Sequence, residues 1–206
     1  MDQRSRRLGV VLFPGFELLD VFGPAEMFGM LTGTVEIAMV AEDKGPVASF
    51  QGPQVVADED FASASQLDLI LVPGGFGTRN EVDNPRTVEF LRRQARGAEV
   101  VMSVCTGASL LARAGLLDGK RATTNKMFFG WVCEQGPKTD WVKEARWVED
   151  GKLVTSSGVS AGIDMALAVI TRLYGEQTGE RLAVAAEYDW HRDASWDPFA
   201  RVHGLV

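Results

Sequence analysis

The sequence has few of the residues that cross-link a protein or bind a metal ion. Only two of its 206 residues are cysteines, Cys105 and Cys133, and neither belongs to a CxxC pair. Only two are histidines, His191 and His203, and no potential metal ligands cluster in the sequence. We therefore expect free thiols in a reducing compartment, and a protein that needs no metal or other cofactor.

Long apolar runs and an excess of positive charge are also missing. The apolar stretch Leu8–Phe13 ends at Pro14 and is too short for the core of a signal peptide, and no run approaches the length of a membrane span. The net charge of -7 disfavours binding to nucleic acid or to anionic lipid. With 46% apolar and 24% charged residues, we expect a soluble cytoplasmic protein. We expect one domain over residues 1–206, with residues 1–7 as a flexible tail.

Apolar, strand-like runs alternate with amphipathic, helix-like stretches, a pattern typical of a parallel sheet covered on both faces. The predicted strands are 8–13, 35–40, 67–72 and 100–104, with a short edge pair at 47–50 and 54–57. The predicted helices are 17–31, 85–97, 107–114, 160–174 and 178–188. Pro24 is expected to kink or break the first helix. Asp150-Gly151 predicts a hairpin turn between 146–149 and 152–155, and 58–60 is interpreted as a charged loop.

The segment Ser103–Gly107 places a cysteine directly after a buried strand and before an Ala- and Leu-rich helix. This is the pattern of a nucleophile elbow, in which a sharp turn lifts a reactive side chain into a cleft. The neighbouring helix start would lower the pKa of the Cys105 thiol. The alternative is a packed core cysteine, which is our interpretation of Cys133 in its apolar helical stretch.

Two further segments are candidates for the same site. Glycines in Pro73–Gly77 follow the neighbouring strand, so the N–H groups of Gly75 and Thr106 could together bind a developing negative charge. The alternative is a simple tight turn. Asp20 lies on an apolar helix face, where burial would raise its pKa and allow it to act as acid or base beside the thiol. A helix-capping role for Asp20 is the alternative.

These motifs, in this order, resemble the ThiJ/PfpI superfamily, and most closely its isonitrile (isocyanide) hydratase branch. The resemblance rests on the following segments: Phe13-Pro14, Asp20-x-x-Gly23-Pro24, Val72–Gly75, Ser103–Gly107, Ala114–Thr124 and Ser157–Asp164. It implies a flavodoxin-like parallel sheet with helices on both faces, as in class I glutamine amidotransferases, and a homodimer.

The resemblance also implies the roles of the site residues. Cys105 would be the nucleophile, Asp20 its carboxyl partner, Thr106 would position the substrate, and Gly75 and Thr106 would supply the anion-stabilising amides. The chain departs from many relatives at Asn125, which stands where they have histidine. Asparagine cannot relay protons, and its presence removes the partner for a Cys–His dyad.

The function that the resemblance implies is hydration of a small isonitrile to an N-substituted formamide through a thioimidate on Cys105. A redox-sensing role for an oxidisable Cys105, or action on another electrophile such as a glyoxal, is the alternative. A ligand-binding module of a transcription regulator is disfavoured because such relatives carry an added helix-turn-helix domain. We expect His191 at a helix end or a dimer surface, with a place in the active cleft as the alternative.

Overall fold

Short runs of Val, Ile and Leu form the centre of a seven-stranded sheet. The computed structural model describes residues 5–206, and its central strands β6 (Leu69–Val72) and β7 (Val100–Ser103) are buried at every position. Strands with no polar alternation are typical of a parallel sheet that is covered on both faces. The remaining strands of this sheet are β1 (Arg6–Val11), β2 (Val35–Ala41), β5 (Glu59–Asp60), β10 (Trp147–Asp150) and β11 (Leu153–Ser156).

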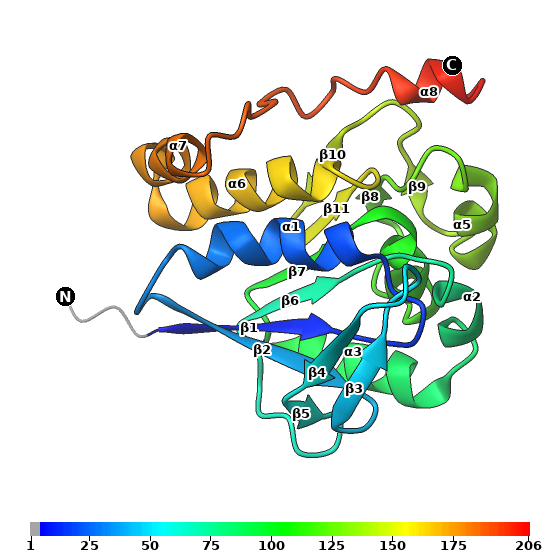
Figure 1. Cartoon of the computed structure of the whole chain (residues 1–206). Coiled ribbons are helices and arrows are strands. Elements are labelled where there is room, and N and C mark those ends of the chain that lie inside the picture. The colour runs from blue at the N-terminus through cyan, green and yellow to red at the C-terminus, as the bar shows by residue number, and fades with distance from the viewer. Residues whose placement is uncertain (1–4) are drawn as a thin grey trace.

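The strand order is β10-β11-β7-β6-β1-β2-β5. All neighbouring strands run parallel except the β10–β11 hairpin. The parallel strands therefore end at one edge of the sheet, where Figure 1 shows the loops that lead to α2 and α5. The predicted flavodoxin-like parallel sheet is confirmed.

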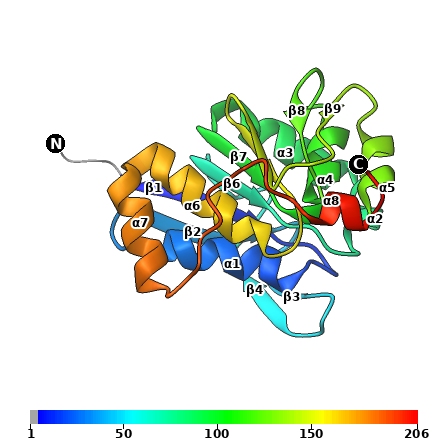
Figure 2. The same ribbon diagram turned by 90° about the horizontal axis from the view of Figure 1, so that it is seen from above.

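Helices cover both faces of the sheet. The helices are α1 (Leu18–Gly29), α2 (Thr78–Glu81), α3 (Pro85–Gly97), α4 (Ala108–Arg113), α5 (Phe129–Gln135), α6 (Ala161–Tyr174), α7 (Glu176–Ala185) and α8 (Phe199–Val202). On one face α1 packs against α6, and α6 packs against α7; α3 and α4 lie on the other (Figures 1 and 2). No helix among residues 5–206 is long and apolar enough to cross a membrane.

The predicted helix that begins after Asn84 is confirmed, and its start follows from local chemistry. The side chain of Asn84 accepts a hydrogen bond from the N–H of Arg86, and Pro85 occupies the first turn, where its missing N–H costs nothing. Gly175, with a φ of 91°, follows the last residue of α6, so this helix ends where the predicted helix 160–174 ends. The predicted hairpin is also confirmed, with Asp150 paired to Leu153 across the turn.

Four expectations differ from the structure. Pro24 does not divide the first helix, because α1 runs through it while Gly23 packs against Ile163 of α6. Glu59 lies in strand β5, where it pairs with Arg7, so 58–60 is not simply a charged loop. Strand β1 begins at Arg6, which shortens the expected tail; residues 1–4 lie outside the described residues. Cys133 is half-buried rather than part of the core.

Two small sheets and a long C-terminal segment complete the fold. Strands β3 (Gly45–Ala48) and β4 (Gln54–Ala57) form the predicted pair, which stands apart from the main sheet. Strands β8 (Arg121–Ala122) and β9 (Asp140–Trp141) form a second pair. Beyond α7 the chain returns over α6 to α8, at the same end of the molecule as α5 (Figures 1 and 2). The C-terminal segment therefore lies near the carboxyl ends of the parallel strands.

Candidate active site

Cys105 occupies a sharp turn immediately after β7. Its φ is 57°, a left-handed conformation that is uncommon for a residue with a side chain. The turn continues as a short 3-10 helix, Cys105–Gly107, before α4 begins. Gly107 is required here, since a Cβ on it would lie 2.3 Å from the carbonyl oxygen of Val72. The predicted elbow is therefore present, with its side chain fixed by the crowded backbone around it.

The sulfur of Cys105 is more enclosed than the sequence suggests. The residue is 6% exposed, and burial is the main cause that raises the pKa of its thiol, followed by the negative charge of Asp20. The N–H of Thr106 and the side chain of Asn125 act in the opposite direction and lower the pKa. The expectation of an exposed, acidified thiol is wrong, because the loss of hydration outweighs the donors that surround the sulfur.

Asp20 lies beside this thiol and is fully buried in α1. Its Oδ2 accepts a hydrogen bond of 2.8 Å from the N–H of Gly74, while its Oδ1 has no hydrogen-bond partner within residues 5–206. Burial is the main cause that raises the pKa of Asp20 well above its usual range, and the hydrogen bond from Gly74 lowers it. A buried carboxylate oxygen without a partner is costly, so this carboxyl group favours its protonated form.

The thiol and the carboxyl group therefore form one protonated pair at rest. The negative charge of an ionised Asp20 raises the pKa of the Cys105 thiol, whereas a hydrogen bond with Cys105 lowers the pKa of Asp20. Two neighbouring negative charges are thereby disfavoured. Glu17, at the start of α1, adds to this effect on both groups. The site can thus release or accept one proton between Cys105 and Asp20, which is what acid–base chemistry on a small molecule requires.

The predicted pair of anion-binding amides is arranged differently from the expectation. The N–H of Gly75 donates to Oγ1 of Thr106 at 3.1 Å, so it is already satisfied within the protein. The Thr106 hydroxyl also lies 3.3 Å from the carbonyl oxygen of Gly75 and links the two loops. The N–H of Thr106 interacts with the sulfur of Cys105. The substrate-binding roles of Gly75 and Thr106 stay predictions.

Gly74 holds the carboxyl group and the elbow together. A Cβ on Gly74 would lie 2.6 Å from the nitrogen of Thr106 and 2.9 Å from Oδ2 of Asp20. Only a residue without a side chain allows this approach. The sequence places Gly74 in a glycine-rich loop, but its contact with Asp20 depends on the packing of α1 against the end of β6.

Asn125 is the residue whose part in this site the sequence reasoning missed. Its Oδ1 accepts a hydrogen bond of 3.1 Å from the N–H of Phe128, which turns its Nδ2 away from that loop. The amide group donates a hydrogen bond to Cys105 and lowers the pKa of the thiol. Asparagine cannot relay a proton, but it can stabilise negative charge on sulfur. The sequence could have indicated this role, because an asparagine in place of histidine still offers an N–H donor.

A cavity of about 320 Å³ is formed by loops that are distant in the sequence and lies next to Asn125 and Gly158, the neighbours of the thiol; Cys105 itself does not line it. Leu19 of α1, Asn125 and Gly158 line it together with Phe199 and His203 from the C-terminal segment. His203 therefore reaches this cavity, whereas the ring of His191 stacks on Trp196 with centroids 4.5 Å apart. His191 does not line the cavity, in line with its predicted position outside the cleft.

The fold and this site define a flavodoxin-like α/β domain with a buried thiol–carboxyl pair at a strand-to-helix elbow. The model of the DJ-1/PfpI family matches residues 6–172. The chain belongs to the DJ-1/PfpI family. The sequence resemblance to ThiJ/PfpI proteins is thereby confirmed.

Two relatives and one solved structure illustrate the range of this similarity. An isonitrile hydratase of Pseudomonas putida is 38% identical over 88% of this chain and 78% of its own length. The HTH-type transcriptional regulator CdhR of Pseudomonas aeruginosa is 30% identical over 84% of this chain, which spans 52% of the regulator. The crystal structure of a ThiJ/PfpI family protein from Pseudomonas syringae superposes with a TM-score of 0.81 at 30% identity, covering 92% of this chain and 77% of that one.

Proposed function

We propose that this protein hydrates a small isonitrile to an N-substituted formamide, with Cys105 as the nucleophile and Asp20 as the acid–base group. The proposal makes it a hydro-lyase that needs no cofactor. Its main support is the buried, partnerless Oδ1 of Asp20 beside the Cys105 thiol. The 38% identity to an isonitrile hydratase over most of both chains adds independent support.

In the first step the thiol adds across the terminal carbon of the isonitrile. The sulfur forms the new S–C bond, and one proton is delivered to the same carbon, which gives a thioimidate on Cys105. A raised pKa keeps the thiol protonated, so the proton that the carbon needs is already in the site. The amide of Asn125 and the N–H of Thr106 stabilise the charge that develops on sulfur.

In the second step water attacks the thioimidate carbon. Asp20, protonated at rest, donates its proton to the nitrogen of the substrate and then, as the carboxylate, accepts a proton from that water. The C–S bond then breaks, the formamide leaves, and the thiol regains its proton through Asp20. Covalent catalysis divides one difficult hydration into two easier steps. Proton transfer by Asp20 contributes about 10²- to 10⁴-fold to the rate.

The test uses purified protein, a panel of small isonitriles and mass analysis of both protein and product. Hydration in ¹⁸O-water should place the label in the formyl group of the product. Asp20→Asn should accumulate an adduct whose added mass equals that of the whole isonitrile, since the thiol proton stays in the adduct. Cys133→Ala serves as the matched control and should retain full turnover.

Turnover by Cys105→Ala at the rate of the unaltered protein would overturn this proposal. The redox-sensing alternative depends on a thiolate that reacts readily with peroxide. The burial that raises the pKa of Cys105 does not favour it. Intact-mass analysis after mild peroxide, run beside the isonitrile assay, separates the two functions because only the redox role requires rapid, reversible oxidation.

A further inference from the structure

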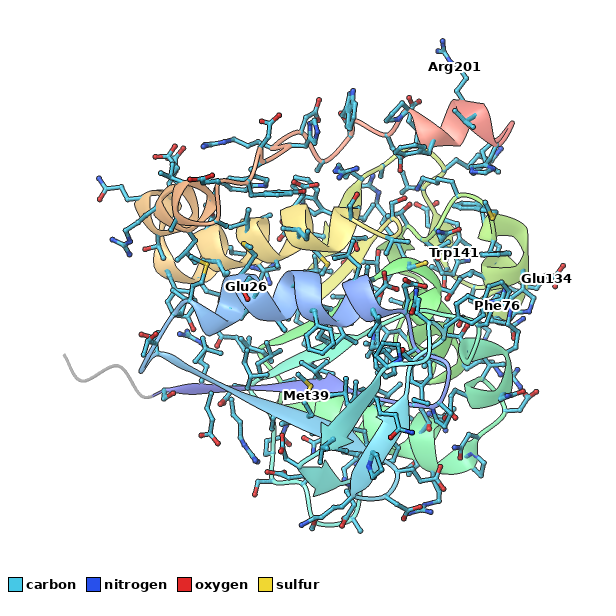
Figure 3. The ribbon with its side chains drawn as sticks, viewed as in Figure 1. Glu26, Met39, Phe76, Glu134, Trp141 and Arg201 are labelled. Carbon is cyan, nitrogen blue, oxygen red and sulfur yellow. The ribbon has the colours of Figure 1, made fainter. Side chains whose placement is uncertain are left out.

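Arg79 lies close to the reactive cysteine and is surrounded by aromatic rings. Its guanidinium carbon is 4.9 Å from the ring centre of Phe76, 4.6 Å from that of Phe128 and 4.3 Å from that of Trp131. These rings come from the loop before α2, the loop before α5 and α5 itself. Figure 3 shows Phe76 at the end of the molecule where α2 and α5 lie. The rings hold the planar guanidinium group in a fixed position.

Arg79 has no acidic partner among the residues that the structure describes. Its hydrogen bond from Nη1 goes to the Oγ1 of Thr78, at a long 3.4 Å. Other half-buried or buried arginines of the chain have carboxylate partners, such as Arg7 with Glu59 and Arg146 with Asp164. Burial lowers the pKa of Arg79, whereas negative charge on Cys105 would raise it. The site therefore contains a partly dehydrated cation without a counter-ion.

A short chain of contacts connects this cation to the reactive sulfur. The hydroxyl of Thr78, to which Arg79 donates, lies 3.3 Å from the hydroxyl of Thr106. Thr106 follows Cys105 directly in the chain. On the other side, Phe128 packs against the guanidinium group and binds Asn125 through its N–H. Arg79 and Cys105 also interact electrostatically, which puts the cation and the sulfur in the same neighbourhood.

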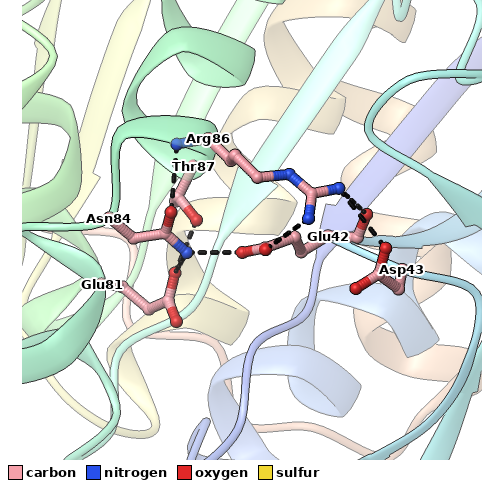
Figure 4. Close-up of polar contacts among 6 residues, drawn as sticks. All are labelled: Glu42, Asp43, Glu81, Asn84, Arg86 and Thr87. Carbon is pink, nitrogen blue, oxygen red and sulfur yellow. Dashed lines mark hydrogen bonds and ion pairs between the residues drawn. The ribbon is translucent and has the colours of Figure 1, made fainter.

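The short helix that carries Arg79 is fixed by a polar network (Figure 4). Glu81 accepts hydrogen bonds from Asn84 at 3.1 Å and from Thr87 at 2.5 Å. Asn84 also donates to Glu42 at 2.6 Å, which ties α2 to the loop after β2. The carboxylates of this network thus accept hydrogen bonds from Asn84, Arg86 and Thr87, and none of them neutralises Arg79.

We propose that Arg79 binds a carboxylate group of the substrate and thereby directs the electrophilic carbon toward Cys105. The inference deepens the proposed function, on which it rests for the identity of the electrophile: the substrate would be an isonitrile that carries a carboxylate. A monoanion matches the site better than a phosphate does. Arg79 supplies one positive charge, Glu17 lies near the same thiol, and Lys126 is already paired with Asp197. Paired N–H donors of arginine also match the two oxygens of a carboxylate.

The first experiment compares two alkylating reagents of similar size, iodoacetate and iodoacetamide. In each reaction the thiolate of Cys105 forms an S–C bond and iodide leaves, but only iodoacetate carries a carboxylate. The rates are measured by peptide mass analysis at pH 8.5 and low salt in a Cys133→Ser background. The ratio of the iodoacetate rate to the iodoacetamide rate should fall about tenfold in Arg79→Met, the loss expected for one charge-assisted contact.

Arg181→Met, on the exposed face of α7, removes the same charge far from the site and should leave the ratio unchanged. Arg79→Lys retains the charge but not the paired donors and should give an intermediate ratio. A loss of stability alone would slow or speed both reagents together, so the ratio separates binding from folding. An unchanged ratio in Arg79→Met, or no alkylation of Cys105 by either reagent, would overturn the inference.

The second experiment compares isocyanoacetate with its methyl ester as substrates. Arg79→Met should raise KM for the carboxylate about tenfold and leave that for the ester nearly unchanged. If the protein hydrates both compounds and Arg79→Met affects them equally, the carboxylate site is wrong while the hydratase proposal stands. If neither compound is hydrated but the alkylation ratio depends on Arg79, the hydratase proposal is wrong while the carboxylate site stands.

Discussion

Gly158 lies so close to Cys105 that a Cβ at position 158 would be 2.8 Å from the sulfur. The same Cβ would be 2.4 Å from Nδ2 of Asn125, whose amide is held by the N–H of Phe128. A side chain at position 158 would therefore displace the sulfur, the amide group that donates to it, or both.

Gly158→Ala should reduce kcat/KM for an accepted isonitrile about 10- to 100-fold, because a small displacement of reacting groups has an effect of this size. The rate of Cys105 alkylation by iodoacetamide should fall with it. Gly130→Ala is the matched control, since a Cβ at that position meets nothing within 4 Å. Equal activity of the two variants would contradict the proposed approach to the sulfur.

Asn125→Ala should make the thiol of Cys105 harder to ionise. The side chain of Asn125 lowers the pKa of this thiol, so its removal shifts the pH dependence of alkylation toward higher pH. Near neutral pH the rate should fall about tenfold, the size expected for one hydrogen bond to a charged group. Asn80→Ala, in the exposed part of α2, should retain the original profile. If the pH dependence of alkylation is unchanged in Asn125→Ala, Asn125 does not stabilise the thiolate of Cys105.

Asp20→Asn should stabilise the fold while it abolishes turnover. Because the folded state raises the pKa of Asp20, the folded protein binds its proton more tightly than the unfolded chain does. Stability is therefore lost as the pH rises from the ordinary carboxyl range through the raised value in the fold. Above that range Asp20→Asn avoids the loss and is the more stable protein.

Calorimetry from pH 5 to pH 9 measures this effect. The Tm of Asp20→Asn should exceed that of the unaltered protein by about 2–4 °C per kcal/mol, and the difference should grow with pH. Asp189→Asn removes an exposed carboxylate and should show no such growth. A difference that shrinks as the pH rises would mean that Asp20 is stabilised as the anion.

Asp197→Ala should release the C-terminal wall of the cavity. Asp197 is buried, and its Oδ2 lies 3.3 Å from Nζ of buried Lys126, the residue after Asn125. Removal of one partner of a buried ion pair costs about 3–5 kcal/mol. Urea unfolding measures that loss, and trypsin cleavage at Arg201 reports release of α8. Asp193→Ala, in an exposed turn, is the control. Equal stability of both variants would show that the pair does not hold this segment.

Much of the fold could be predicted because it follows from local patterns. The buried runs that became β6 and β7, and the Asn84 cap before α3, need only neighbouring residues to be recognised. Pro24 was misjudged because tertiary packing of α1 on α6 overrides a local preference. Glu59 was misjudged because its strand is short and depends on Arg7 and on the edge of β2.

The site could be predicted only where its residues form a motif. The elbow and Asp20 have recognisable sequence surroundings, but the exposure of the sulfur depends on Asn125 and Gly158, which belong to two other loops. Desolvation has no sequence pattern, so the direction of the pKa shift of Cys105 was predicted wrongly. The proposed role of Arg79 likewise depends on three aromatic side chains that the fold brings together.

The left-handed backbone conformation of Cys105 affects which substitutions this position tolerates. A side chain in that conformation is strained by roughly 1 kcal/mol, and glycine would relieve the strain. Glycine would also leave the volume of this buried side chain empty, and that loss opposes the relief of strain. Laboratory evolution toward heat tolerance without an activity screen should therefore exert little pressure on this position.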